Sequence, residues 1–227
     1  MDQSTFDLRR GFEFKHPTTI LISGPTGSGK TRFLVQCLKE NIIFPQPTRI
    51  IWVYGEWQPL YDEIKSLWPW VEFSKDFGNQ LYESLHTSDQ NLVVFDDMMN
   101  EAGSSINLAN LFTKGSHHRN LTVVFIVQNL FNQAKSMRTV SLNSHYMVLF
   151  KNPRDTGQIR TLASQMFPAH PKFLTTAFAD ATTEKYGYLV LDLHPETAEE
   201  LRVRSHIFST EIPVVYQPQG EYKKGSK

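Results

Sequence analysis

The chain has 227 residues, of which 40% are hydrophobic and 20% charged, with 23 Lys and Arg against 23 Asp and Glu. This composition predicts a folded protein with one large core, and it excludes a disordered chain. The formal net charge of zero also excludes a polybasic protein that binds nucleic acid over its whole surface, although it leaves room for local basic loops.

The cellular location is predicted from the cysteine content and from the apolar runs. The single cysteine, Cys37, can form no internal disulfide, which favours a reducing, intracellular compartment over secretion. Residues 1–10 contain two aspartates and no apolar core, so they do not have the pattern of a signal peptide. The longest apolar runs, 121–127 and 92–95, are far shorter than the roughly 20 residues that a membrane-spanning helix needs. We therefore expect no secretion and no membrane insertion.

Strands and helices are predicted to alternate, which is typical of a mostly parallel sheet covered on both faces. Apolar, β-branched runs predict strands at 18–23, 49–54, 71–73, 92–95, 121–127, 146–150, 188–192 and 203–208. Helices are predicted at 31–41, 57–67, 77–85, 106–113, 155–166 and 172–181, with Leu60, Ile64 and Leu67 on one side of the second. Without a composition break, we expect an N-terminal extension (1–15), one α/β domain (16–216) and a flexible polar tail (217–227).

A glycine-rich loop separates the first buried strand from the first helix. Its residues are Gly24, Pro25, Thr26, Gly27, Ser28, Gly29, Lys30 and Thr31, which fit the P-loop pattern G-x-x-x-x-G-K-[ST], and Arg32 follows directly. Small residues let backbone N–H groups converge on phosphate oxygens, and the helix points its positive end at them. Lys30 is predicted to contact the β- and γ-phosphates, and the Thr31 hydroxyl to bind Mg²⁺. We therefore expect an ATP–Mg²⁺ site with its nucleotide contacts at 24–32.

The apolar strand 92–95 runs into two adjacent acids, Asp96 and Asp97, which is the form of a Walker B segment. Because neighbouring strand residues face opposite ways, the two carboxylates are not expected to act as a glycosidase-type pair. Asp96 is predicted to hold Mg²⁺ and its waters. Asp97, which enters the loop, is predicted to orient and deprotonate the attacking water, with Glu101 as the second candidate for this base.

Two further candidates flank the strand 121–127. Gln128 follows it at the carboxyl edge of the sheet, where ligands bind, and is predicted to contact the γ-phosphate or the attacking water; the alternative is a turn residue that satisfies backbone groups. Arg119 precedes it on the opposite edge, from which it is predicted to complete a neighbouring subunit's site as an arginine finger. A solvated basic loop is the alternative for Arg119, and Arg154, after the strand 146–150, is the rival finger.

The blocks GPTGSGKT, VVFDD, KGSHHRN–LTVVFIVQN and FKNPRD together resemble the FtsK–HerA superfamily of additional-strand P-loop ATPases. Within it, they are similar to the genome-packaging ATPases of Polinton-like and adintovirus-like elements, which are related to the poxvirus packaging ATPase. Members share a Gln at the place of Gln128 and an Arg before that strand. The resemblance covers about residues 16–194, and it departs at Asp97, where a Glu is common.

The resemblance implies a three-layer α/β fold with a mostly parallel central sheet, and a motor that hydrolyses ATP to move double-stranded DNA into a viral capsid. It also implies a ring of identical subunits, a hexamer or a pentamer, that works in the host nucleus or cytoplasm during assembly or stays with the virion. Capsid portal or vertex proteins are then candidate partners. Lys135 and Arg138 are candidates for the pore through which a neutral subunit moves DNA; ordinary surface charge is their alternative.

Two other functions remain open from the sequence. A nucleotide or nucleoside kinase would use arginines on a lid, for which Arg154 and Arg160 are available. Kinases of this lineage usually place the Walker B strand directly beside the P-loop strand, whereas here another strand intervenes. A non-translocating NTP switch of the GTPase type would need an N-K-x-D motif, and Lys151-Asn152 has the reverse order.

Overall fold

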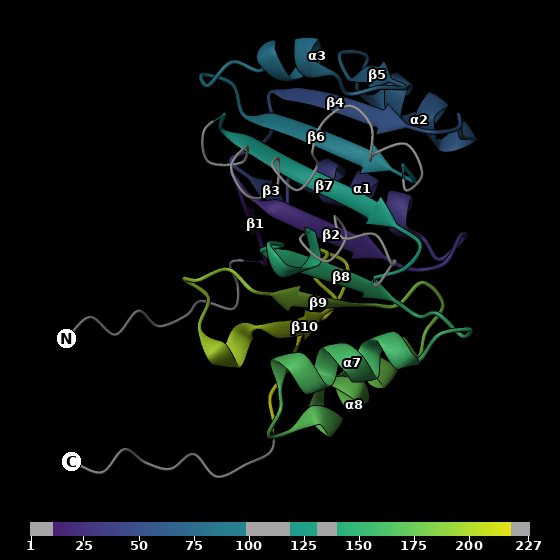
Figure 1. Cartoon of the computed structure of the whole chain (residues 1–227), viewed down its shortest axis with the longest axis vertical. Coiled ribbons are helices and arrows are strands. Elements are labelled where there is room, and N and C mark those ends of the chain that lie inside the picture. The colour runs from purple at the N-terminus through teal and green to yellow at the C-terminus, as the bar shows by residue number, and fades with distance from the viewer. Residues whose placement is uncertain (1–10, 99–118, 131–139, 219–227) are drawn as a thin grey trace, which may run out of the picture.

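A single large sheet forms the frame of the protein in the computed structural model, which describes residues 11–98, 119–130 and 140–218 (Figure 1). Within these residues the sheet has nine strands, ordered from one edge to the other as β11 (Val214–Tyr216), β10 (Val203–Ser205), β9 (Tyr188–Asp192), β8 (Tyr146–Phe150), β2 (Thr19–Ser23), β7 (Leu121–Val127), β6 (Asn91–Asp96), β4 (Arg49–Tyr54) and β5 (Glu72–Ser74).

The strands from β8 to β5 run parallel, whereas β9, β10 and β11 continue the sheet in antiparallel pairs. β7 lies between β2 and β6, with Leu21 and Phe95 both opposite Phe125 in the register. The strand that precedes the P-loop is therefore separated from the strand that ends in Asp96 by one additional strand. All residues of β2, β6, β7, β8 and β9 are buried, as expected for strands covered on both faces.

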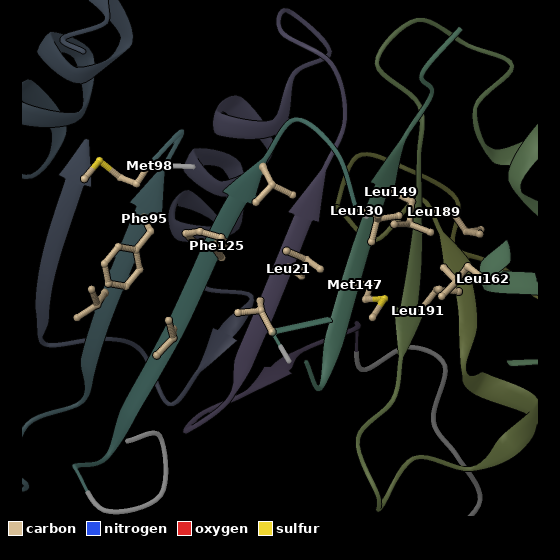
Figure 2. Packing of buried hydrophobic residues seen from close by; sticks show 14 of the residues in the cluster. Leu21, Phe95, Met98, Phe125, Leu130, Met147, Leu149, Leu162, Leu189 and Leu191 are labelled. Carbon is tan, nitrogen blue, oxygen red and sulfur yellow. The ribbon is translucent and has the colours of Figure 1, made fainter. Parts of the chain in front are cut away.

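Helices cover the two faces of the sheet. Side chains such as Ile20 and Ile22 pack against α1 (Lys30–Lys39), α2 (Pro59–Leu67) and a small parallel pair made by β1 (Phe14–Lys15) and β3 (Ile43–Phe44). Leu21, between them, points to the other face, where the core includes α7 (Gly157–Met166) and α8 (Pro171–Ala181). Figure 2 shows this second core, with Leu21, Phe95, Phe125 and Met147 on adjacent strands. The alternation within each strand thus produces three layers.

Most predicted elements are present, with boundaries shifted by a few residues. The short helix α3 (Asn79–Glu83) and the 3₁₀ turn η2 (Glu199–Leu201) are also present, and no helix in the described residues is both long and apolar enough to cross a membrane. β1, β3 and β11 were not predicted, and the predicted strand at 203–208 ends at Ser205. The predicted helix at 106–113 lies outside the described residues. The division into extension, domain and tail stays a prediction.

One predicted helix face is buried only in part: Ile64 is buried and Leu60 is half-buried against the core. In α2 the buried side chains are Tyr61 and Ile64, whereas Leu67 is 45% exposed. Leu67 is the last residue of the helix, after which the chain continues toward β5. Tyr61 takes the inward position because its ring packs against Trp52 of β4 and its hydroxyl meets a buried acceptor at the end of β6.

Candidate functional site

The loop between β2 and α1 has the backbone shape that its glycines permit. Gly27 and Gly29 have φ values of 78° and 101°, in the left-handed region where a side chain is strained. At Gly24 a Cβ atom would lie 2.6 Å from Cβ of Phe150, so β8 passes too close for any larger residue. The spacing of these glycines therefore lets the loop wrap closely around the start of α1, as predicted for a P-loop.

Lys30 and Thr31 begin α1 and point into the site. Lys30 Nζ donates a hydrogen bond to the carbonyl oxygen of Pro25 over 2.9 Å, which places its ammonium group across the loop. Burial lowers the pKa of Lys30, and the negative charges of Asp96 and Asp97 oppose this shift. Thr31 Oγ1 donates to Asp96 Oδ2 over 3.2 Å, so the first turn of α1 is joined to the end of β6.

Asp96 is only 2% exposed, and Tyr61 is its second hydrogen-bond donor in the described residues. The Tyr61 hydroxyl, itself fully buried, donates to Asp96 Oδ2 over 2.9 Å. Burial raises the pKa of Asp96, while the hydrogen bonds from Tyr61 and Thr31 and the charge of Lys30 act in the opposite direction. Burial also raises the pKa of Tyr61, and the adjacent Asp96 raises it further. The phenol therefore stays protonated and keeps donating to the carboxylate.

Asp97 lies one residue beyond the strand and in a different environment. Its φ of 59° is left-handed, so the chain turns sharply where β6 ends. The side chain is exposed, and Gln128 Nε2 donates to its carboxylate oxygens over 3.0 and 3.1 Å. Because of this turn, the buried Asp96 and the exposed Asp97 both line the same cavity. The two adjacent acids therefore differ in their hydrogen-bond partners and in their exposure.

A cavity of about 690 Å³ joins these groups at the carboxyl ends of β2, β6 and β7. This volume lies within the range of pockets that hold small organic ligands and cofactors. One end of the cavity is polar and is lined by Lys30, Thr31, Asp96, Asp97 and Gln128. The other end carries the aromatic residues Phe33, Tyr186, Tyr188 and Phe208, together with the polar residues Glu184, Lys185, His206 and Glu211. The sequence predicted the polar end but not the aromatic end.

The remaining predicted residues lie at the margin of the cavity or away from it. Arg32 lines the cavity, but its side chain is 71% exposed and its Nη1 lies 3.5 Å from Glu63 Oε2 of α2. Arg119 precedes β7, at the opposite edge of the sheet from the cavity. Arg154, in the loop after β8, is exposed and is not among the residues that line the cavity. Glu101, Lys135 and Arg138 lie outside the described residues.

The guanidinium of Arg119 is engaged within its own chain. Its Nη1 donates to the carbonyl oxygens of Glu83 and Leu85 over 3.4 and 3.1 Å, and its Cζ lies 4.9 Å from the ring centroid of Tyr82. Asn91, at the start of β6, donates from Nδ2 to the Arg119 carbonyl oxygen over 3.0 Å. These contacts hold Arg119 against the end of α3 and the residues that follow it, so it is not brought to the phosphate end of its own subunit.

No protein-family model matches the sequence, and no curated protein matches it. Among solved structures, the chain is similar to the genome packaging NTPase B204 from Sulfolobus turreted icosahedral virus 2 in complex with ATP-gammaS, with a TM-score of 0.54, 14% identity, and coverage of 89% of this chain and 98% of that chain. The complex with AMPPCP gives a TM-score of 0.55, 13% identity and the coverages 89% and 98%.

B204 from Sulfolobus Turreted Icosahedral Virus, a DNA-packaging ATPase, is similar with a TM-score of 0.54, 10% identity, and coverage of 90% of this chain and 99% of that chain. At such identities the likeness concerns the fold. The chain has the α/β fold of the P-loop NTPases, with a large, mostly parallel sheet, and the predicted fold class is confirmed.

Proposed function

We propose that the chain is the ATPase of a genome-packaging motor, which hydrolyses ATP and uses the free energy to move double-stranded DNA into a capsid. The main support for ATP hydrolysis is that five side chains line the polar end of one cavity: Lys30, Thr31, Asp96, Asp97 and Gln128. These residues come from the P-loop, α1 and the ends of two strands, and together they supply a cation, metal ligands, a base and a hydrogen-bonding amide.

Mg²⁺ and the nucleotide phosphates fit the residues that are present. Thr31 Oγ1 and Asp96 Oδ2, 3.2 Å apart, offer the hydroxyl and carboxylate oxygens that Mg²⁺ prefers. These two side chains would hold the ion, directly or through its waters, and the bound ion would neutralise charge on the phosphates. The Lys30 ammonium exchanges the Pro25 carbonyl oxygen for the β- and γ-phosphate oxygens, where its charge stabilises the transferring phosphoryl group.

Asp97 and Gln128 act on the attacking water. The Gln128 amide nitrogen is anchored on the Asp97 carboxylate, which leaves the amide oxygen to accept a hydrogen bond from the water. The exposed Asp97 carboxylate then accepts the proton that the water loses as it attacks the γ-phosphate. Asp96 is buried and, with Thr31, is the proposed holder of the metal ion, so the exposed Asp97 is the carboxylate left for this role.

Packaging is supported by the fold that this chain shares with B204 over 89–90% of its length, together with the later sequence blocks that resemble packaging ATPases. We infer that the affiliation is with the Polinton- and adintovirus-like group, and that the subunits form a hexameric or pentameric ring around DNA during capsid assembly inside the host. In such a ring we expect Arg119, which lies on the edge away from its own P-loop, to complete a neighbour's site. This role requires it to leave the carbonyl oxygens of Glu83 and Leu85.

The test is ATP hydrolysis with and without double-stranded DNA. We expect hydrolysis that DNA stimulates, and loss of hydrolysis in Lys30→Ala with the fold retained. Lys39→Ala, at the other end of the same helix, is the matched control. Phosphate transfer to a nucleoside or nucleotide would favour the kinase, and hydrolysis indifferent to DNA would favour the switch. Near-normal turnover by folded Lys30→Ala protein would contradict the proposed site.

A further inference from the structure

The aromatic residues at one end of the cavity have no role in the proposed phosphate chemistry. This end is contiguous with the P-loop, and three of its rings pack on one another. The centroid of Phe33, on α1, lies 4.8 Å from that of Tyr188 and 5.3 Å from that of Phe208, and the last two are 5.8 Å apart. A continuous wall of rings therefore extends from the helix that begins at Lys30.

This wall is held in place by hydrogen bonds. The Tyr188 hydroxyl donates to Glu211 Oε2 over 2.6 Å, and the same oxygen accepts from the backbone nitrogen of Phe208 over 3.1 Å. The backbone nitrogen of Ser209 donates to Glu40 Oε2, at the end of α1, over 2.7 Å. The Glu211 carboxylate is thus committed to the protein, and the segment that carries Phe208 is fastened to the P-loop helix.

Tyr186 lines the same cavity from another segment. Its side chain is 57% exposed, although its ring packs against the P-loop, with Cδ1 3.3 Å from the position of a Cβ atom built on Gly29. Its backbone is left-handed, with a φ of 66°, and so is that of His206, with a φ of 56°. Strained residues of this kind cluster at ligand-binding positions. Lys185 Nζ lies 4.9 Å from the centroid of the Tyr186 ring, and Lys185 is itself exposed, so a base that stacks on this ring beside the phosphate-binding loop takes the place of the ammonium group.

We propose that Tyr186 and the aromatic wall bind the base of the nucleotide, and that they recognise it by stacking, so that purine nucleoside triphosphates bind more tightly than pyrimidine ones. The inference rests on the proposed function, since the phosphates must occupy the P-loop for the base to reach Tyr186. Stacking depends on the area of the base, and every base has an aromatic face. The aromatic end therefore adds to the affinity for the nucleoside, whereas the polar end holds only the phosphates.

The experiment compares MgATP, MgCTP and magnesium tripolyphosphate, which lacks a nucleoside, as ligands in equilibrium binding. Tyr186→Asn removes the ring and keeps a residue that tolerates a left-handed φ. Tyr186→Phe keeps the ring and is the matched control. Stacking on one aromatic side chain corresponds to a loss of roughly 5- to 150-fold in affinity when it is removed. We expect a loss of this size for MgATP in Tyr186→Asn, a smaller one for MgCTP, none for tripolyphosphate, and near-normal binding by Tyr186→Phe.

The outcomes separate this inference from the proposed function. Equal weakening of MgATP and tripolyphosphate would mean that Tyr186 only supports Gly29, and unchanged MgATP binding would mean that it holds no base; either result overturns the inference alone. Wild-type protein that binds neither ligand overturns the proposed function and the inference with it. If Tyr186→Asn does not fold, Tyr186→Leu removes the aromatic face, keeps the bulk, and is judged by the same comparison.

Discussion

The hydrogen bond from Tyr61 to Asp96 should stabilise the protein by an amount that depends on pH. Tyr61→Phe removes a fully buried hydroxyl and leaves the ring in its packing against Trp52. A hydrogen bond to a charged group contributes about 1.5–3 kcal/mol, so the free energy of unfolding should fall by about this amount at neutral pH. For a protein of this size, that corresponds to a decrease of roughly 3–12 °C in Tm.

The sign of the pH dependence follows from the carboxyl group. Burial raises the pKa of Asp96, and the Tyr61 hydrogen bond opposes this shift because it stabilises the ionised form. Removing the hydroxyl therefore raises the pKa further. A carboxyl with a raised pKa in the folded state contributes its full stability below the unfolded pKa and loses it as the pH rises through the folded value. The destabilisation by Tyr61→Phe should thus be largest above the pKa of Asp96 and shrink in acid to about 0.5–1.5 kcal/mol, the contribution of a neutral hydrogen bond.

The assay is denaturant unfolding of wild type and Tyr61→Phe at about pH 7.5 and again at about pH 3.5, which lies below the ordinary pKa of an aspartate side chain. Tyr54→Phe is the control, because its ring lies 5.6 Å from that of Tyr61 and its hydroxyl is not among the donors to Asp96 in the described residues. Mg²⁺-dependent nucleotide binding should also require a higher pH in Tyr61→Phe. An equal loss of stability at both pH values would refute the reasoning.

Three other changes test separate parts of the molecule. Asp97→Asn should retain MgATP and lose turnover, whereas Asp96→Asn should also weaken Mg²⁺-dependent binding; equal affinities and equal residual rates would contradict this division. Arg119→Ala should bind ATP nearly normally and hydrolyse it about 10³-fold more slowly or worse, and mixing it with Lys30→Ala protein should restore some hydrolysis. Mixed oligomers that form and stay inactive would exclude Arg119 as a finger. Gly187→Ala should lower the free energy of unfolding by about 1–3 kcal/mol, because its Cβ would lie 2.4 Å from the Ala181 carbonyl oxygen; unchanged denaturant unfolding would contradict this contact.

Sequence alone determined the parts of the site that depend on local structure. Gly27 and Gly29 allow the left-handed backbone that the loop before α1 needs. Because this conformation depends only on neighbouring residues, the loop could be predicted from the sequence. Buried strands are apolar throughout, so the acids and the amide that follow β6 and β7 were recognisable as strand ends. Parallel strands bring their carboxyl ends to one edge, which is why Lys30, Asp96 and Gln128 were predicted to meet.

Only the tertiary structure decided which other side chains reach that edge. Tyr61 is distant from Asp96 in sequence, and it meets the carboxylate because α2 packs on the face of the sheet beside β6. Tyr186 and Phe208 join the cavity because the chain returns to the P-loop helix after α8 and after the antiparallel strand β10. Arg119 is held by backbone carbonyl oxygens of Glu83, the last residue of α3, and of Leu85, and the sequence gives no pattern for such backbone contacts. Such contacts depend on backbone atoms and on how helices pack on the sheet. The sequence around a residue therefore does not show which distant segment will lie next to it in the fold.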